Sequence, residues 1–177
     1  SPKGPLDTAR KGLAATGNAN FGYFGGGKTA SNLATVDRVD YFNDTATASP
    51  KGALSAAGDY LSATGNSDFG YFGGAGSPRS TVDRIDYSND TATAVAKGNL
   101  NTAKYRAAAT GNTNFGYFSG GNLSNVERVD YSNDTATSAT KGPLSASERQ
   151  YVGATGNADF GYFAGGSNPS ASPSKLS

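Results

Sequence analysis

Charged residues are concentrated in one short motif that occurs three times in the 177-residue chain. The motif reads Asp/Glu-Arg-x-Asp and lies at 37–40, 83–86 and 127–130. Its paired carboxylates could act as general acid and base or bind a cation. A catalytic centre is needed only once, however, whereas this motif recurs along the chain. We therefore predict that its charges form ion pairs between strands or between repeats.

A second group of oxygen ligands follows the central copy of this motif. Asp86, Ser88 and Asp90 supply oxygens at alternate positions, as at the start of a calcium loop. The central Gly and the distant bidentate Glu of such a loop are missing. A tight turn between two strands explains the same residues, so we expect no metal and no other cofactor.

The residue types that are missing exclude several kinds of chemistry. The chain has no Cys and no His, which excludes zinc–thiolate sites, iron–sulfur clusters, thiol nucleophiles and Ser-His-Asp triads. The net charge of +1 and the pI of about 7.8 give no electrostatic reason to expect nucleic acid as a partner. No run of apolar residues approaches the roughly 20 needed to cross a bilayer. We expect a protein that is not an enzyme and does not insert into a membrane.

The chain is built from repeats. The sequence Thr-Gly-Asn-x-x-Phe-Gly-Tyr-Phe occurs four times, with its first Phe at 21, 69, 115 and 160, and a Lys-Gly pair recurs in step with it. The period is about 46 residues, close to that of propeller blades. It divides one domain, 1–177, into repeats at about 3–50, 51–96 and 97–140 and a partial repeat at 141–177.

Each period has the pattern of four short strands. In the third period we predict strands at 107–110, 115–118, 126–131 and 136–140, with a tight turn at 132–135. No window has the apolar periodicity of a helix, so we predict an all-β fold of four-stranded antiparallel blades, a β-propeller. Phe and Tyr recur at fixed repeat positions and should form the core between blades, and the Gly inside the second strand should allow neighbouring blades to approach closely.

These segments resemble kelch repeats. Leu6–Arg10, Phe69–Gly74 and Val126–Asp130 are similar, in the same order, to the Leu and Arg segment, the strand ending in Gly-Gly and the Val-Glu-Arg strand of that family. The resemblance implies a β-propeller. The copper oxidases that share this architecture need His ligands and a Cys-modified Tyr, which this chain does not have. Two of the family's aromatic positions hold aliphatic or small residues here. The family's Arg is kept as Arg10, becomes Gly58 and Lys104, and is offset as Arg149.

The number of repeats predicts an incomplete ring. Three interpretations follow: a piece of a longer propeller, a ring closed with other chains, or a four-bladed ring completed by the C-terminal tail. We favour the first two, because 167–177 contains two Pro and no strand pattern. Copies of this chain or another protein would then cover the open blades.

The copies differ most in the loop after the second strand of each blade and in the approach to its first strand. Both connections should emerge on one face of an up-and-down blade, where binding residues are favoured. We predict a structural or recognition module for a protein partner, with an extracellular or virion surface location. The alternative is a glycan-binding or carbohydrate-active propeller. The candidate contact residues are Lys28, Asp59, Tyr60, Arg79, Lys104, Tyr105, Arg106, Asn122, Arg149 and Tyr151.

Overall fold

The computed structural model describes residues 1–121, 123–144, 149–167 and 174–176 and confirms an all-β fold. Four antiparallel sheets follow one another along the chain, and in each sheet the strands are hydrogen-bonded in sequence order. The first three sheets have four strands and the fourth has three: β1 (Ala14–Gly17), β2 (Phe21–Gly25), β3 (Val36–Asp40) and β4 (Ser49–Lys51); β5 (Ser62–Gly65), β6 (Phe69–Gly73), β7 (Val82–Asp86) and β8 (Val95–Ala96); β9 (Ala107–Gly111), β10 (Phe115–Gly120), β11 (Asn125–Asp130) and β12 (Ala139–Pro143); β13 (Gly153–Gly156), β14 (Gly161–Ala164) and β15 (Ser174–Leu176).

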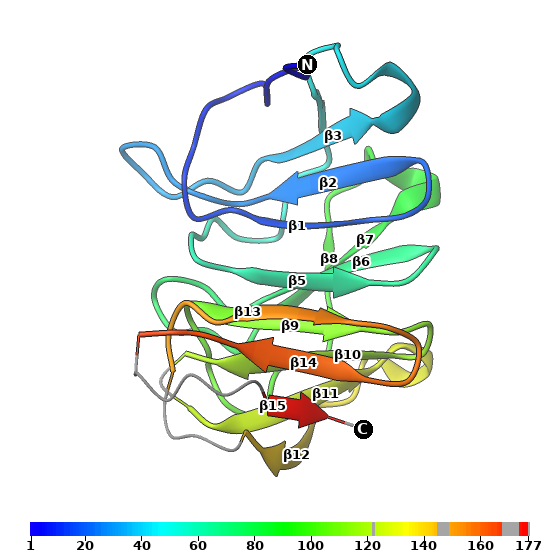
Figure 1. Ribbon diagram of the computed structural model, residues 1–177. Helices are drawn as coiled ribbons and strands as arrows, with labels where there is room; N and C mark the ends of the chain where they lie inside the picture. Colours follow the sequence, from blue (N-terminus) through cyan, green and yellow to red (C-terminus); the bar gives the residue numbers. More distant parts are fainter. Residues whose placement is uncertain (122, 145–148, 168–173, 177) are drawn as a thin grey trace.

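The sheets are stacked through their first strands. β1 contacts β5, β5 contacts β9, and β9 contacts β13. The first sheet and the fourth sheet lie at opposite ends of the stack (Figure 1), and the described residues do not close a ring. Each end of the stack therefore presents a sheet face that no other described sheet covers.

Three apolar cores lie between successive sheets. Tyr23 of β2 packs with Phe72 and Ile85 of the second sheet, and the same arrangement recurs with Tyr71, Phe118 and Val129 one sheet later. The third core contains Phe163. Because side chains alternate across a strand, the Tyr of each second strand faces the next sheet and the following Phe faces the preceding sheet. This confirms the predicted aromatic core between repeats.

Glycines in the second strands allow this stacking. A Cβ built at Gly70 would lie 2.7 Å from Cγ2 of Thr16, and one built at Gly116 would lie 2.8 Å from Cγ2 of Thr64, each Thr belonging to the preceding sheet. These distances are too short for any side chain. The predicted close approach at Gly is confirmed.

One predicted boundary is wrong, because β12 begins at Ala139 instead of 136. The predicted turn at 132–135 is present as a 3₁₀ helix, Tyr131–Asn133, followed by a turn at 134–135. Asp130 caps this helix by accepting a hydrogen bond from the Ser132 N–H, and the Ala136 N–H is already bonded to the Asn133 carbonyl. Equivalent 3₁₀ helices lie at Tyr41–Asn43 and Tyr87–Asn89.

The C-terminal tail also departs from expectation. The segment 167–177 was predicted to contain no strand, yet β15 pairs with β14, with Lys175 opposite Tyr162. Pairing with an existing strand supplies the order that the local sequence does not predict. The described part of the fourth sheet therefore has a third strand.

Candidate functional site

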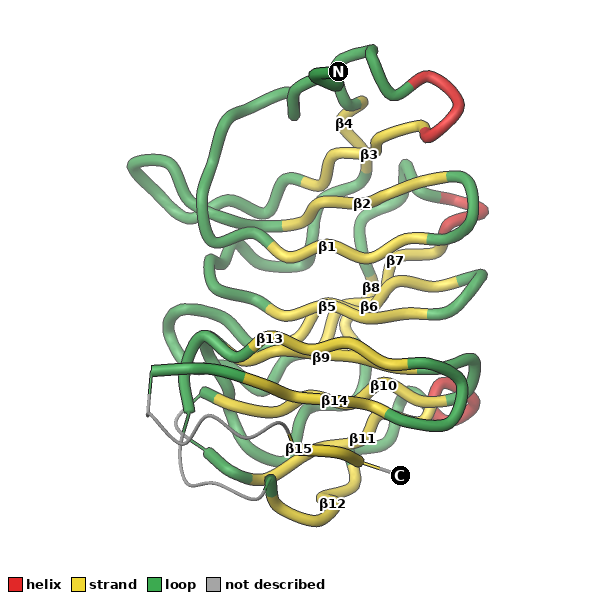
Figure 2. Tube along the Cα trace, viewed as in Figure 1, coloured by secondary structure: helices red, strands yellow, loops and turns green. Residues whose placement is uncertain are grey.

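The connections lie on two opposite edges of the stack. The 3₁₀ helices gather on one edge and the long loops on the other (Figure 2). On the loop edge, isolated bridges join Arg79 to Lys104 and Leu123 to Arg149. These pairs connect the loop after a second strand with the approach to the next first strand, which confirms that the two variable connections share one face.

Four residues that lie one or two positions before the first strands, at the same repeat position, share an unusual backbone conformation. Gly12 has φ of +67°, and Tyr60, Arg106 and Tyr151 have φ of +52°, +53° and +57°. The last three are bulky residues in a region that favours Gly, and such residues cost of order 1–3 kcal/mol each. The surrounding structure holds them there: the Tyr60 N–H donates to the Gly12 carbonyl (2.6 Å), Arg106 to Tyr60 (3.1 Å) and Tyr151 to Arg106 (3.0 Å).

This backbone ladder gathers a tyrosine–arginine cluster, which consists of Tyr60, Tyr105, Arg106, Gln150 and Tyr151. The guanidinium carbon of Arg106 lies 5.0 Å, 5.4 Å and 4.9 Å from the ring centres of Tyr60, Tyr105 and Tyr151. Arg106 Nη1 donates to Gln150 Oε1 (2.7 Å), and Gln150 Nε2 donates to the Tyr105 hydroxyl (3.3 Å). Rings on several sides and one side-chain amide hold the cation in place.

The Arg106 cation has no carboxylate partner within the described ranges. No carboxylate of those residues forms an ion pair with it, and its Nε is buried without a hydrogen-bond acceptor there. Tyr151 is 54% exposed. Tyr and Arg are the residue types that dominate binding energy at protein interfaces. The arrangement suits a ligand that brings a carboxylate beside an apolar or aromatic group.

The other candidate contact residues do not join the cluster. Lys104 and Arg149 are almost completely buried and Asp59 is buried as well, so the prediction that they form surface contacts is corrected. Lys28 and Arg79 are half-buried and belong to backbone bridges within the loops. Asn122 lies outside the described residues.

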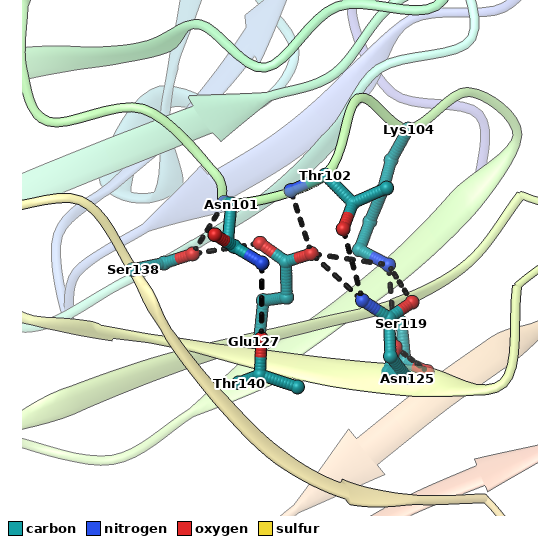
Figure 3. A network of polar contacts seen from close by, with 8 residues as sticks. All are labelled: Asn101, Thr102, Lys104, Ser119, Asn125, Glu127, Ser138 and Thr140. Carbon is teal, nitrogen blue, oxygen red and sulfur yellow. Dashed lines mark hydrogen bonds and ion pairs between the residues drawn. The ribbon is translucent and has the colours of Figure 1, made fainter.

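Lys104 is part of a buried polar network (Figure 3). Its Nζ donates to Asn125 Oδ1 (2.9 Å) and lies 3.9 Å from Glu127 Oε1, and both charged side chains are 0% exposed. Glu127 also accepts hydrogen bonds from the Thr102 N–H (2.9 Å) and the Ser138 hydroxyl (2.7 Å). Desolvation lowers the pKa of Lys104 to about 8, against the opposing effect of Glu127. The network ties a loop to β11 and is structural.

Equivalent carboxylates tie the loops of the other sheets, with different partners. Arg10 donates to Asp37 at 2.7 Å between fully buried side chains. Asp83 accepts from the N–H (3.0 Å) and hydroxyl (2.6 Å) of Ser55, and burial raises its pKa. Arg79 from the following loop approaches the position where the second repeat has Gly58. It thereby occupies the space of the missing long side chain.

Arg149 is in register with Arg10, which corrects its predicted offset. Arg10 Nε donates to the Gly26 carbonyl (2.7 Å), and Arg149 Nη1 donates to the equivalent Gly165 carbonyl (3.3 Å). One extra residue separates Arg149 from the preceding Lys-Gly pair. The spacing from that pair therefore places Arg149 one residue out of phase with Arg10 in the sequence.

Charges of the repeated Asp-Arg motif do form ion pairs between sheets, as predicted. Arg38 lies 2.7 Å from Asp90, and Arg84 lies 2.8 Å from Asp134. The acceptors are the Asp residues of the Asn-Asp-Thr turns, outside the motif itself. Asp86, which was weighed as a calcium ligand, instead accepts from the Ser88 N–H and hydroxyl, and these hydrogen bonds lower its pKa.

Two features of the cluster were not predicted from the sequence: the positive φ shared by Tyr60, Arg106 and Tyr151, and the hydrogen bonds of Gln150. The sequence signal for the positive φ was Gly12, because a Gly at the position of these three residues indicates a left-handed backbone conformation. Gln150 lies one residue before the strained Tyr151 and had no distinguishing pattern. Its role is visible only from its contact with the neighbouring loop.

No known protein family matches the sequence, and no curated protein matches it significantly. Within the described ranges, no helix has the length and apolar character needed to cross a bilayer. Those ranges also contain no group of three or more acidic residues placed to hold a metal ion.

Proposed function

We propose that the chain is a kelch-like β-propeller segment that acts as a non-enzymatic recognition scaffold, with the tyrosine–arginine cluster as its contact site. One observation carries this proposal: three bulky residues are held at positive φ in the same repeat position, and their side chains meet. Strained residues of this kind persist where the surroundings fix them, and they concentrate at binding sites. A Gly at each position would avoid the strain but would remove the cluster.

The partner we favour is a protein segment with a carboxylate next to an apolar or aromatic side chain. The carboxylate would pair with the Arg106 guanidinium, and the neighbouring group would pack on Tyr60 or Tyr151. Binding a glycan is the second candidate, because tyrosine rings beside a fixed cation also suit sugar rings and acidic sugars. The two candidates use the same residues but different ligands.

A displayed peptide library tests the first candidate directly. The library is selected on the wild-type chain and counter-selected on Arg106→Gly, which keeps the backbone relaxed and removes the cation. We expect enriched acidic peptides whose affinity falls at least tenfold with Arg106→Gly and is unchanged with Val95→Thr, an exposed control on β8. Peptides that bind Arg106→Gly as well as wild type would contradict the proposal, and selective retention of acidic glycans on an array would favour the second candidate.

The strain itself needs a separate measurement. Tyr151→Gly and Tyr151→Ala remove the same ring, but only Gly accepts φ of +57° without cost. We expect Tyr151→Gly to be more stable than Tyr151→Ala by about 1 kcal/mol in urea unfolding. Equal stability of the two variants would show that the position stores no strain.

A further inference from the structure

The interface between successive sheets is repeated twice with the same polar contacts. Tyr23 stacks on Tyr87 of the next sheet with ring centres 4.6 Å apart, and its hydroxyl donates to Asp90 (3.0 Å). Arg38 and Lys51 also reach Asp90, at 2.7 Å and 3.4 Å. One sheet later, Tyr71, Arg84 and Lys97 meet Asp134 and Tyr131 at nearly the same distances.

The outer face of the first sheet carries one half of this interface. We call it the leading face, and it consists of Phe24, Val39, Tyr41 and Asp44. Tyr41 is 50% exposed, whereas the equivalent Tyr87 and Tyr131 are half-buried, and Phe24 is half-buried, whereas the equivalent Phe72 and Phe118 are buried. Asp44, the equivalent of Asp90, has Lys3 as its single ion-pair partner among the described residues. The acceptor and the stacking ring are thus present without the tyrosine and arginine that meet them elsewhere.

The outer face of the fourth sheet carries the other half. We call it the trailing face, and it consists of Thr155, Tyr162, Ala164 and strand β15. Tyr162 is half-buried, and Thr155 and Ala164 are exposed, whereas the equivalent Thr64 and Thr110 are buried against a following sheet. In the backbone register, Lys175 pairs with Tyr162 as Arg38 pairs with Tyr23. The trailing face therefore supplies the tyrosine ring of the interface.

The N-terminal segment already lies where the last strand of a preceding sheet would lie. Ser1–Lys3 has the same sequence as Ser49–Lys51, which forms β4. The Gly4 N–H donates to the Asp44 carbonyl (2.7 Å), as the Gly52 N–H donates to the Asp90 carbonyl (2.8 Å). Among the described strands, β15 pairs with β14 alone, and an unpaired strand edge is a template for adding another strand.

We propose that the leading face of one copy of this chain docks on the trailing face of a second copy. Tyr41 stacks on Tyr162, Asp44 accepts from the Tyr162 hydroxyl, and Phe24 packs against the trailing face. Ser1–Lys3 adds the fourth strand beside β15. The contact is heterologous, so each copy keeps one free face of each kind, and a ring or an open chain of copies follows. This assembly does not involve the tyrosine–arginine cluster.

Sedimentation equilibrium of the full chain tests the assembly. We expect the wild type to exceed the monomer mass of 17.9 kDa at micromolar concentrations. Asp44→Lys blocks the leading face, Ala164→Glu blocks the trailing face, and each alone should return to the monomer mass. Mixed in equal amounts, the two variants should form dimers and nothing larger, because each mixed pair has one intact interface.

Controls separate assembly from folding and from ligand binding. Circular dichroism shows whether each variant keeps its fold, and Tyr41→Asp with Thr155→Glu repeats the design at other exposed positions. Arg106→Gly should leave the mass unchanged, so loss of peptide binding and loss of assembly are distinguishable. A wild type that stays monomeric at about 0.5 mM, a concentration near the Kd of weak protein contacts, would overturn the proposal. Folded single variants that still assemble, or a mixture that stays monomeric, would also overturn it.

Discussion

At the scale of residues, Asp90 and Asp44 occupy the same repeat position with opposite surroundings. Asp90 accepts hydrogen bonds from a tyrosine and an arginine and forms an ion pair with a lysine, and its side chain is 9% exposed. The Asp44 side chain is 36% exposed and pairs with an exposed lysine. The same residue type should therefore contribute very differently to stability in the isolated chain.

We predict that Asp90→Ala destabilises the fold by about 3–5 kcal/mol, because it leaves the Tyr23 hydroxyl without its acceptor and two cations without their buried counter-charge. Asp44→Ala, the matched control, should cost about 1 kcal/mol or less, as for other exposed pairs. Urea unfolding of both variants, at concentrations where the chain is monomeric, measures the difference. Similar losses for the two variants would mean that the stacked interface does not depend on its buried carboxylate.

At the scale of elements, the sequence predicts whatever depends on local pattern. The strands from Phe115 and from Val126 were predicted to within two residues, because alternation and the Gly-Asn turn signals are local. β12 and β15 were misplaced or missed, because their order comes from pairing with a neighbouring strand. The tyrosine–arginine cluster was predicted only as a set of loop residues, since its assembly depends on backbone bonds that join three different repeats.

The contact between Lys104 and Glu127, which joins a loop to β11, should make the stability of the fold depend on pH. Burial lowers the pKa of Lys104 in the folded protein to about 8, against 10.5 for an ordinary lysine. Between these values the unfolded chain binds more protons, so the free energy of unfolding should rise with pH in that window, by up to about 1.4 kcal/mol per unit. Lys104→Met should lack this rise.

Denaturant titrations between pH 7.5 and 10.5 measure this rise as the difference between the free energies of unfolding of wild type and Lys104→Met. Burial raises the pKa of Tyr87 to about 12, so both proteins should lose stability above about pH 10, and that loss cancels in the comparison. Lys11→Met, at an exposed position of the same loop edge, is the control. Parallel pH profiles for all three proteins would show that Lys104 is not held as a desolvated cation.

At the scale of the whole molecule, the described sheets form an open stack, so the position of a sheet decides how its aromatic residues contribute. Phe118 lies between two sheets and is fully buried, whereas the equivalent Phe24 lies on the outer face of the first sheet and is half-buried. In a stack of this kind, stability is close to a sum of sheet terms and nearest-neighbour interface terms. Phe24 has no such interface within one copy.

We predict that Phe118→Ala costs about 3–5 kcal/mol at every protein concentration, because its cavity lies within one copy. Phe24→Ala should cost clearly less in dilute solution. Its cost should grow as concentration rises, because assembly stabilises the wild type by mass action and the variant weakens the face on which assembly depends. Thermal unfolding of both variants across a hundredfold range of concentration separates the two behaviours. A cost of Phe24→Ala that does not change with concentration would mean that the first sheet's outer face stays uncovered in solution, and the heterologous contact between copies would then have no energetic support.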